Sequence, residues 1–103
     1  MMCVENKFIN ILTKAFDIIR ESEIEYEKFG VFGSFARNEI TRNSDIDFVL
    51  IVKELPKRMD IAILRDKFDD IGCDIAFILS SSFSNPVTAF EKNVVKDFKE
   101  INL

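Results

Sequence analysis

The sequence predicts an α+β fold in which a small mixed β-sheet of three to four strands is flanked by helices. Three observations carry this prediction: an amphipathic segment begins the chain, short apolar runs follow it, and helical segments separate and follow those runs. At 103 residues the chain has the length of one domain, so we expect residues 1–103 to form a single domain.

The first predicted element is an amphipathic helix over roughly Val4 to Glu21. Its apolar residues recur at helical spacing with polar residues opposite, and they are Val4, Phe8, Ile11, Leu12, Ala15, Ile18 and Ile19. Lys28 to Phe32 is a short β-prone run that stops at Gly33, and Ser34 to Asn38 has the composition of a short helix leaving that turn. Backbone nitrogens at the start of that helix would point toward an anion.

The second predicted strand covers Asp45 to Lys53 and ends at Leu55-Pro56. It is apolar on both faces after its acids, so we expect helices or another chain to cover both sides. Met59 to Ile71 predicts a second long helix, which meets Gly72 in the position of a C-terminal cap.

A third strand is predicted over Cys73 to Leu79, and its alternation places Asp74, Ala76 and Ile78 on one face. Ser80 to Ser82 is expected to form a short polar loop. Asn85-Pro86 resembles an N-cap followed by proline at the first helical position. A last helix is predicted from the spacing of Val87, Phe90, Val94, Phe98 and Ile101. The eleven phenylalanines and the absence of tryptophan indicate a core built on phenylalanine.

Composition excludes several classes of function. No histidine is present, which rules out histidine acid–base catalysis, the common zinc ligand sets and Ser-His-Asp arrangements. The net charge of −4 disfavours nucleic acid as a partner. Cys3 and Cys73 form no spaced metal pattern, and no export signal is found, so we expect reduced thiols in a cytoplasm. No apolar run approaches the roughly 20 residues that cross a bilayer, which predicts a soluble protein without a membrane partner.

Two aspartates open the second strand. Asp45 and Asp47 follow the Gly33-Ser34 turn after ten residues, and because side chains alternate along a strand they share one face, about 6.6 Å apart. Asp74 supplies a third carboxylate if the second and third strands are neighbours. Mg²⁺ is held by carboxylates together with substrate phosphates, and two such ions stabilise the attacking and leaving oxygens of an in-line displacement. These residues therefore favour a metal site for phosphoryl or nucleotidyl transfer.

In this interpretation Asp45, Asp47 and Asp74 are both metal ligands and catalytic carboxylates, and Asp74 accepts the proton of the attacking hydroxyl. A structural explanation also exists, because aspartates commonly cap the turns that precede strands. The acids alone leave both explanations open.

The Gly33-Ser34 turn would hold the triphosphate of a nucleotide, because such a backbone lets a phosphate approach closely. Arg37 or Arg42 would neutralise charge on the leaving pyrophosphate. A solvated surface arginine is the alternative for either residue.

The combination of Gly-Ser, ten residues and Asp-x-Asp resembles the signature of the DNA polymerase β-type nucleotidyltransferase superfamily. Residues 33–37 look like its Gly-Ser-x-Ala-Arg segment, and residues 44–50 look like its Ser-Asp-x-Asp-hydrophobic segment. Asp74 corresponds to the third family carboxylate, which falls on a later strand. Asn38 stands where the family usually has glycine. The resemblance implies a polymerase β-like nucleotidyltransferase core.

Within that superfamily, so short a chain is similar to the minimal nucleotidyltransferases (MNT), which have no fused helical domain. The resemblance implies an antitoxin beside a HEPN-domain toxin, and an enzyme that uses Mg²⁺, with two ions, to transfer AMP from ATP to a tyrosine of that toxin. A homo-oligomer is a further option for the assembly.

Two alternatives stay open. The first is an antitoxin that neutralises its toxin by binding alone, through the apolar faces formed by Val49 and Ile51 and by Phe90, Val94 and Phe98; packing in the chain's own core is the simpler explanation of those faces. The second is nucleotidyl transfer to a small molecule at the same site.

Overall fold

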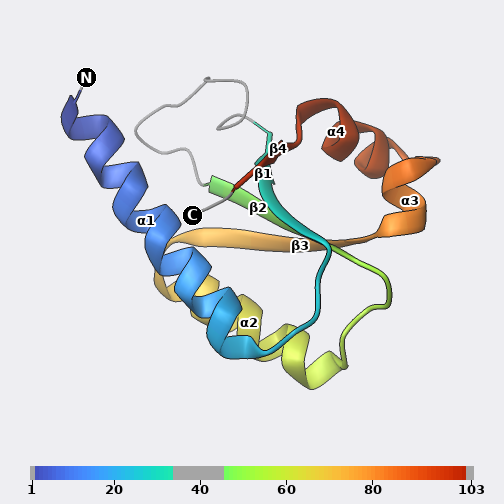
Figure 1. The fold of residues 1–103 in the computed structure, drawn as a ribbon, viewed down its shortest axis with the longest axis horizontal. Helices are drawn as coiled ribbons and strands as arrows, with labels where there is room; N and C mark the ends of the chain where they lie inside the picture. The colour runs from blue at the N-terminus through green and yellow to red at the C-terminus, as the bar shows by residue number, and fades with distance from the viewer. Residues whose placement is uncertain (1, 34–45, 102–103) are drawn as a thin grey trace.

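The computed structural model of the chain describes residues 2–33 and 46–101, where it forms a four-stranded sheet between two helical layers (Figure 1). The elements are α1 (Met2–Ser22), β1 (Lys28–Phe32), β2 (Ile46–Val52), α2 (Arg58–Asp70), β3 (Cys73–Leu79), α3 (Ser80–Ser84), α4 (Ala89–Asp97) and β4 (Lys99–Glu100). The predicted fold class, an α+β arrangement with a mixed sheet, is confirmed.

The strands lie in the order β3-β2-β1-β4. β1 is antiparallel to both β2 and β4, whereas β2 and β3 are parallel. Parallel strands need a crossover, and α2 supplies it by returning the chain to the end of the sheet from which β2 starts. The starts of β2 and β3 therefore lie at the same end of the sheet as the close of β1.

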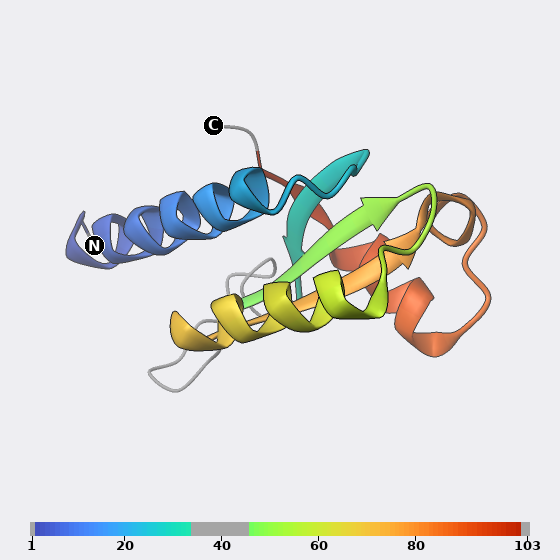
Figure 2. The same ribbon diagram turned by 90° about the horizontal axis from the view of Figure 1, so that it is seen from below.

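β2 is covered on both faces, as its continuous apolar run predicts. One face carries Phe48, Leu50 and Val52, which are buried beneath α1 and α2. The other face carries Val49 and Ile51, which are buried together with Val94 of α4. Figures 1 and 2 show α1 and α2 on one side of the sheet and α3 and α4 on the other.

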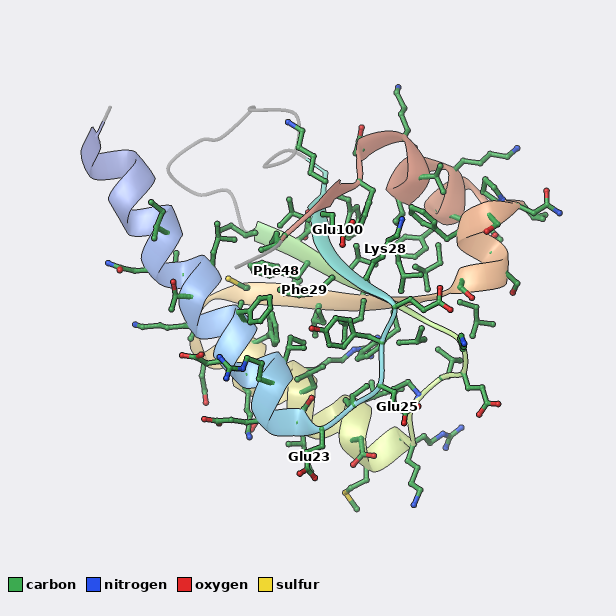
Figure 3. The ribbon with its side chains drawn as sticks, in the orientation of Figure 1. Glu23, Glu25, Lys28, Phe29, Phe48 and Glu100 are labelled. Atoms are coloured by element: carbon green, nitrogen blue, oxygen red, sulfur yellow. The ribbon has the colours of Figure 1, made fainter. Side chains whose placement is uncertain are left out.

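Phenylalanine rings form the centre of the larger core, as the composition predicts. The rings of Phe29 and Phe48 stack with centroids 5.3 Å apart (Figure 3). Phe68 of α2 meets Phe48 edge-on at 5.3 Å, and Phe16 of α1 meets Phe29 edge-on at 6.1 Å. Such offset and edge contacts are the geometries that aromatic pairs prefer.

The two long helices predicted over Val4 to Glu21 and Met59 to Ile71 are confirmed with small differences at their ends, whereas the short helix predicted over Ser34 to Asn38 lies outside the described residues. α1 spans Met2–Ser22, and α2 ends at Asp70. Gly72 has a φ of +71° and donates its N–H to the carbonyl of Asp69 at 2.9 Å. It therefore ends the helix through a left-handed backbone, as predicted.

The prediction of a loop over Ser80 to Ser82 is wrong, because residues 80–84 form the short helix α3. Serine has only moderate helix propensity, and packing decides the conformation here. The rings of Phe83, in this helix, and Phe98 meet edge-on with their centroids 5.1 Å apart. Phe83 also packs against the smaller of the two core clusters, which consists of Val49, Ile51, Ile78 and Val94.

The predicted start of the last helix at Asn85-Pro86 is also wrong. α4 begins at Ala89 and is capped by Thr88, whose side chain accepts a hydrogen bond from the N–H of Glu91. Glu91 in turn accepts from the N–H of Thr88, which completes a capping box. Reciprocal capping satisfies two backbone donors, so this Thr-x-x-Glu spacing sets the helix start and leaves Val87 outside it.

The last helix also ends earlier than its apolar spacing predicts. It stops at Asp97, and Lys99 and Glu100 form β4, which pairs with Val31 and Gly30. Phe98 packs against the core cluster on one face of the sheet and Ile101 against the cluster on the other face. Side chains alternate between faces along an extended chain, so residues three positions apart point to opposite faces.

The apolar faces considered for partner binding are largely internal. Val49, Ile51 and Val94 are 0–1% exposed and pack against one another. Phe98 is partly buried in the same cluster, while Phe90 remains 45% exposed. Core packing within the chain therefore accounts for most of these residues.

Cys73 is buried, and its thiol donates a hydrogen bond to the carbonyl of Ile71 at 3.6 Å. Within residues 2–33 and 46–101, no helix is long and apolar enough to cross a membrane.

Candidate active site

Asp47 and Asp74 are cross-strand partners. Asp47 is the second residue of β2 and Asp74 the second residue of β3, and the parallel register places them directly opposite each other. Neighbouring strands lie about 4.8 Å apart, and paired residues point to the same face. The sequence-based condition that the second and third strands be neighbours is thus met, and two of the three predicted carboxylates are brought together.

Gly33 lies against the first of these carboxylates. It follows β1, has a φ of +76°, and a Cβ atom at this position would lie 2.9 Å from Oδ2 of Asp47. That distance is too short for a real side-chain contact, so any side chain here would displace the carboxylate. The residue predicted to hold phosphate therefore also leaves room for the Asp47 carboxylate.

The remaining predicted site residues, Ser34, Arg37 and Asp45, lie outside the described residues, as do Asn38 and Arg42. Among the residues that the structure describes, no group of three acidic, cysteine or histidine side chains converges on one point. The described part of the chain contributes the pair Asp47 and Asp74.

The two aspartates differ in exposure. Asp47 is half-buried, whereas Asp74 is exposed on β3, which forms one edge of the described sheet. Asp74 also lines a hollow of about 490 Å³ with Arg65, Asp66 and Asp69 of α2. Asp74 is therefore the carboxylate that a large substrate reaches from solvent.

A larger hollow, of about 910 Å³, lies at the opposite end of β2. Its lining comes from residues 22–27 and 53–57 together with Asp60, and Glu23 and Glu25 mark this end of the molecule in Figure 3. It contains neither Asp47 nor Asp74, so its greater size does not make it the reaction centre. The pairing of Asp47 with Asp74 and the backbone at Gly33 identify the candidate site instead, and of these residues only Asp74 lines the smaller hollow.

The carboxylate pair fits a divalent cation by its donor chemistry. Like charges directly opposite on neighbouring strands repel each other, and a cation between them removes that repulsion while taking the oxygen ligands that Mg²⁺ prefers. Because Gly33 has no side chain, nothing at that turn displaces the Asp47 carboxylate from the pair. Asp47 and Asp74 are therefore suitable ligands.

Sequence reasoning missed one neighbour of the site. Phe32 pairs with Asp47 across β1 and β2, so an aromatic ring flanks the carboxylate on the side opposite Asp74. The Phe32 ring contacts Phe90 of α4 edge-on at 5.8 Å. The signal that would have revealed this is the antiparallel register of β1 with β2, which local patterns do not specify.

Comparison with known proteins agrees with this geometry. The chain is 30% identical over 89 residues to the Methanocaldococcus jannaschii protein named "Putative protein adenylyltransferase MJ0128", with 85% of this chain and 88% of that protein covered. The fold is similar to that of a toxin–antitoxin crystallised with AMP-PNP, at a TM-score of 0.63 and 20% identity over 85% of this chain and 69% of the other.

A second similar structure holds the tri-AMPylated Shewanella oneidensis HEPN toxin in complex with an MNT antitoxin. The TM-score is 0.50 and the identity 19%, over 97% of this chain and 71% of that one. The sequence model of the protein family described as "Nucleotidyltransferase domain" matches residues 12–101 of this chain. This span includes Gly33, Asp47 and Asp74. The chain is therefore a nucleotidyltransferase and belongs to the nucleotidyltransferase domain family.

Proposed function

We propose that this chain transfers AMP from ATP to a tyrosine hydroxyl of a HEPN-domain toxin in a Mg²⁺-dependent reaction, and that it acts as the antitoxin of that toxin. The register pairing of Asp47 with Asp74 carries the proposal, because it joins carboxylates from two strands at one point. The name of the M. jannaschii relative and the AMPylated HEPN toxin held by the Shewanella MNT antitoxin support the choice of reaction and partner. The proposal treats residues 1–103 as one domain.

The proposed metal ligands are Asp45, Asp47 and Asp74. Bound there, Mg²⁺ would neutralise charge on the substrate phosphates and make the α-phosphorus easier to attack. The position of Asp47, half-buried at the start of a fully covered strand, gives the site one carboxylate whose backbone is held rigidly by packing on both faces.

Three further residues would bind the nucleotide. Gly33 and Ser34 hold the triphosphate through the backbone of their turn, and Arg37 neutralises charge on the leaving pyrophosphate. The left-handed backbone of Gly33 supports this arrangement, because a side chain at that position would obstruct both the phosphate and the Asp47 carboxylate.

The reaction is a single displacement at phosphorus. The acceptor oxygen forms a bond to the α-phosphorus, the bond from that phosphorus to the oxygen bridging toward the β-phosphate breaks, and pyrophosphate leaves with that electron pair. Asp74 takes the proton of the acceptor hydroxyl as general base. Its exposure on an edge strand suits an acceptor carried by another protein.

The test is a transfer assay with ATP labelled in its α-phosphate and a purified HEPN-domain toxin. Label on a toxin tyrosine, located by mass spectrometry and absent with an Asp45→Ala/Asp47→Ala variant, is the expected result. Asp17→Asn, which changes an exposed acid on α1, is the matched control and should transfer normally. Label no higher than with the double variant would overturn the catalytic proposal.

The same variants distinguish the alternatives. If Asp45→Ala/Asp47→Ala still neutralises the toxin fully, binding alone accounts for antitoxin action. If wild-type chain labels a small hydroxyl compound but not the toxin, the acceptor assignment is wrong while the nucleotidyltransferase assignment stands.

A further inference from the structure

Three side chains form a row across one face of the sheet at the candidate active site. Phe32 of β1 is paired with Asp47 of β2, which is paired with Asp74 of β3. Each step between strands is about 4.8 Å. The row therefore has carboxylates at its centre and on one side, and an aromatic ring on the other.

Phe90 extends the aromatic side of this row. It lies in the first turn of α4, and its ring meets the ring of Phe32 edge-on, with centroids 5.8 Å apart and planes at 89°. Because the two ring planes are nearly perpendicular, at least one face of the Phe90 ring is free of Phe32. Phe90 thus belongs spatially to the active-site end of the sheet although it is distant from it in sequence.

The exposure of Phe90 sets it apart from the phenylalanines of the core. Phe29, Phe48 and Phe68 are 0–1% exposed, whereas Phe90 is 45% exposed. Leaving half of a phenylalanine ring in water forgoes much of the hydrophobic stabilisation that burial supplies. An exposed ring beside a pair of carboxylates indicates a surface that is covered when substrate binds.

We propose that Phe90, supported by Phe32, stacks against the base of the bound nucleotide. The inference rests on the proposed function, because it takes the nucleotide phosphates to be at Asp47 and Gly33. A nucleotide held there by its phosphates carries its base one ribose away, and Phe90 lies one side chain beyond Phe32. The proposed function assigns both carboxylates to the metal and phosphates, so the aromatic side of the row is left for the base.

The chemistry of this contact sets its selectivity. Phenylalanine offers a ring face but no hydrogen-bonding group, so Phe90 favours large flat bases without reading their edges. A purine presents more stacking area than a pyrimidine. The contact therefore favours ATP and GTP over CTP and UTP, and any preference of adenine over guanine comes from other residues.

The experiment measures binding rather than transfer. The affinity of the full chain for α,β-methylene ATP, whose AMP cannot be transferred, is measured by calorimetry with Mg²⁺ for wild type, Phe90→Ala, Phe90→Leu and Phe90→Trp. Base stacking on a single aromatic side chain predicts a roughly five- to hundredfold loss of affinity for Phe90→Ala. Phe90→Leu keeps an apolar side chain and the fold but should lose most of the same affinity, whereas Phe90→Trp should retain it.

Two controls separate base contact from damage to the fold. Inorganic triphosphate with Mg²⁺ has no base, so its affinity should be equal in all four proteins. Val95→Ala alters another partly exposed side chain of α4 and should bind the analogue as wild type does. Equal loss of triphosphate and nucleotide in Phe90→Ala, or full affinity in Phe90→Leu, would overturn the stacking role.

The outcomes also separate this inference from the proposed function. Wild-type binding that is lost in Phe90→Leu supports the base contact even if no AMP reaches a toxin. Unchanged nucleotide binding in the Phe90 variants overturns the base contact alone. A raised KM for the toxin with unchanged nucleotide affinity would assign Phe90 to the acceptor instead, and a wild-type chain that binds neither nucleotide nor triphosphate would overturn both proposals.

Discussion

Gly33 and Asp47 are so close that a Cβ atom on the glycine would lie 2.9 Å from Oδ2 of the aspartate. Gly33 directly follows the last residue of β1, whereas Asp47 is the second residue of the neighbouring strand β2. A single methyl group at Gly33 therefore acts on the candidate metal ligand directly. This makes the position sensitive in function as well as in stability.

Gly33→Ala should destabilise the fold by about 1–2 kcal/mol, because a non-glycine residue pays that cost for a left-handed backbone. It should also abolish nucleotide transfer, since the new methyl group displaces the Asp47 carboxylate. Urea unfolding measures the first effect and the transfer assay the second.

Gly72→Ala is the matched control for this prediction. Gly72 has nearly the same backbone, with a φ of +71°, yet a Cβ atom there meets nothing within 4 Å. It should lose a similar amount of stability and keep its activity. Equal transfer activities in Gly33→Ala and Gly72→Ala would show that the closeness of Gly33 to Asp47 does not matter for nucleotide transfer.

Asp74→Asn should lower transfer about a hundredfold or more, the usual contribution of a general base, while making the metal-free chain more stable. The gain, up to about 1 kcal/mol, comes from removing the repulsion between carboxylates directly opposite on neighbouring strands. Because salt screens exposed charges, the gain should shrink as ionic strength rises. Urea unfolding at low and high salt, without Mg²⁺, gives the measurement, and a loss of stability instead would argue against close carboxylates.

Phe68→Ala should reduce stability by about 3–5 kcal/mol, the usual cost of removing a buried aromatic ring. Phe68 is fully buried and contacts Phe48, the residue after Asp47. Met59→Ala on the same helix removes a side chain that is 71% exposed and should stay within about 0.5 kcal/mol of wild type. Urea midpoints compare the two variants, provided that the dependence of unfolding free energy on urea has the same slope in both. A Phe68→Ala variant as stable as wild type would contradict the assignment of Phe68 to the core.

The capping box of α4 makes stability depend on pH. Hydrogen bonds from the N–H groups of Val87 and then Thr88 lower the pKa of Glu91 below its ordinary value of 4.5. A lowered folded-state pKa stabilises the fold above the unfolded pKa, and this stabilisation is lost as pH falls through the folded pKa. Glu91→Gln should therefore be less stable than wild type at pH 7, with the difference disappearing in the acid range below pH 4.5.

Thr88→Ala removes the other half of the same box and should cost about 1 kcal/mol at pH 7. Unfolding curves recorded from neutral to acid pH follow both variants. A Glu91→Gln difference that stays constant across this range would rule out a role for the carboxylate charge.

Much of the fold was predictable from local pattern. The strands at residues 28–32 and 73–79 and the helix over most of residues 58–70 follow directly from alternation, helical spacing and glycine position. The C-terminal part was not, because a serine run becomes helical when Phe83 packs against Phe98. Tertiary contacts of this kind override weak local preference.

The candidate site was predictable in its chemistry and less so in its surroundings. Sequence reasoning brought Asp74 to the site only on the condition that the second and third strands be neighbours, which the structure meets. The placement of Phe32 and Phe90 beside Asp47 depends on strand register and on the docking of α4. Register and docking arise from contacts between residues far apart in sequence. The roles of Asp45, Ser34 and Arg37 stay predictions.

Asp47 and Asp74 stand at the amino ends of the two parallel strands, whereas doubly wound parallel sheets bind their ligands at the carboxyl ends. The carboxyl end of β2 opens instead onto the loop at residues 53–57, beside the larger hollow. From Asp47 to Val52 the chain advances roughly 17 Å. A fluorophore or tether attached to that loop would therefore lie at the opposite end of the strands from Asp47 and Asp74. It could label or immobilise the protein without entering the space where phosphate chemistry takes place.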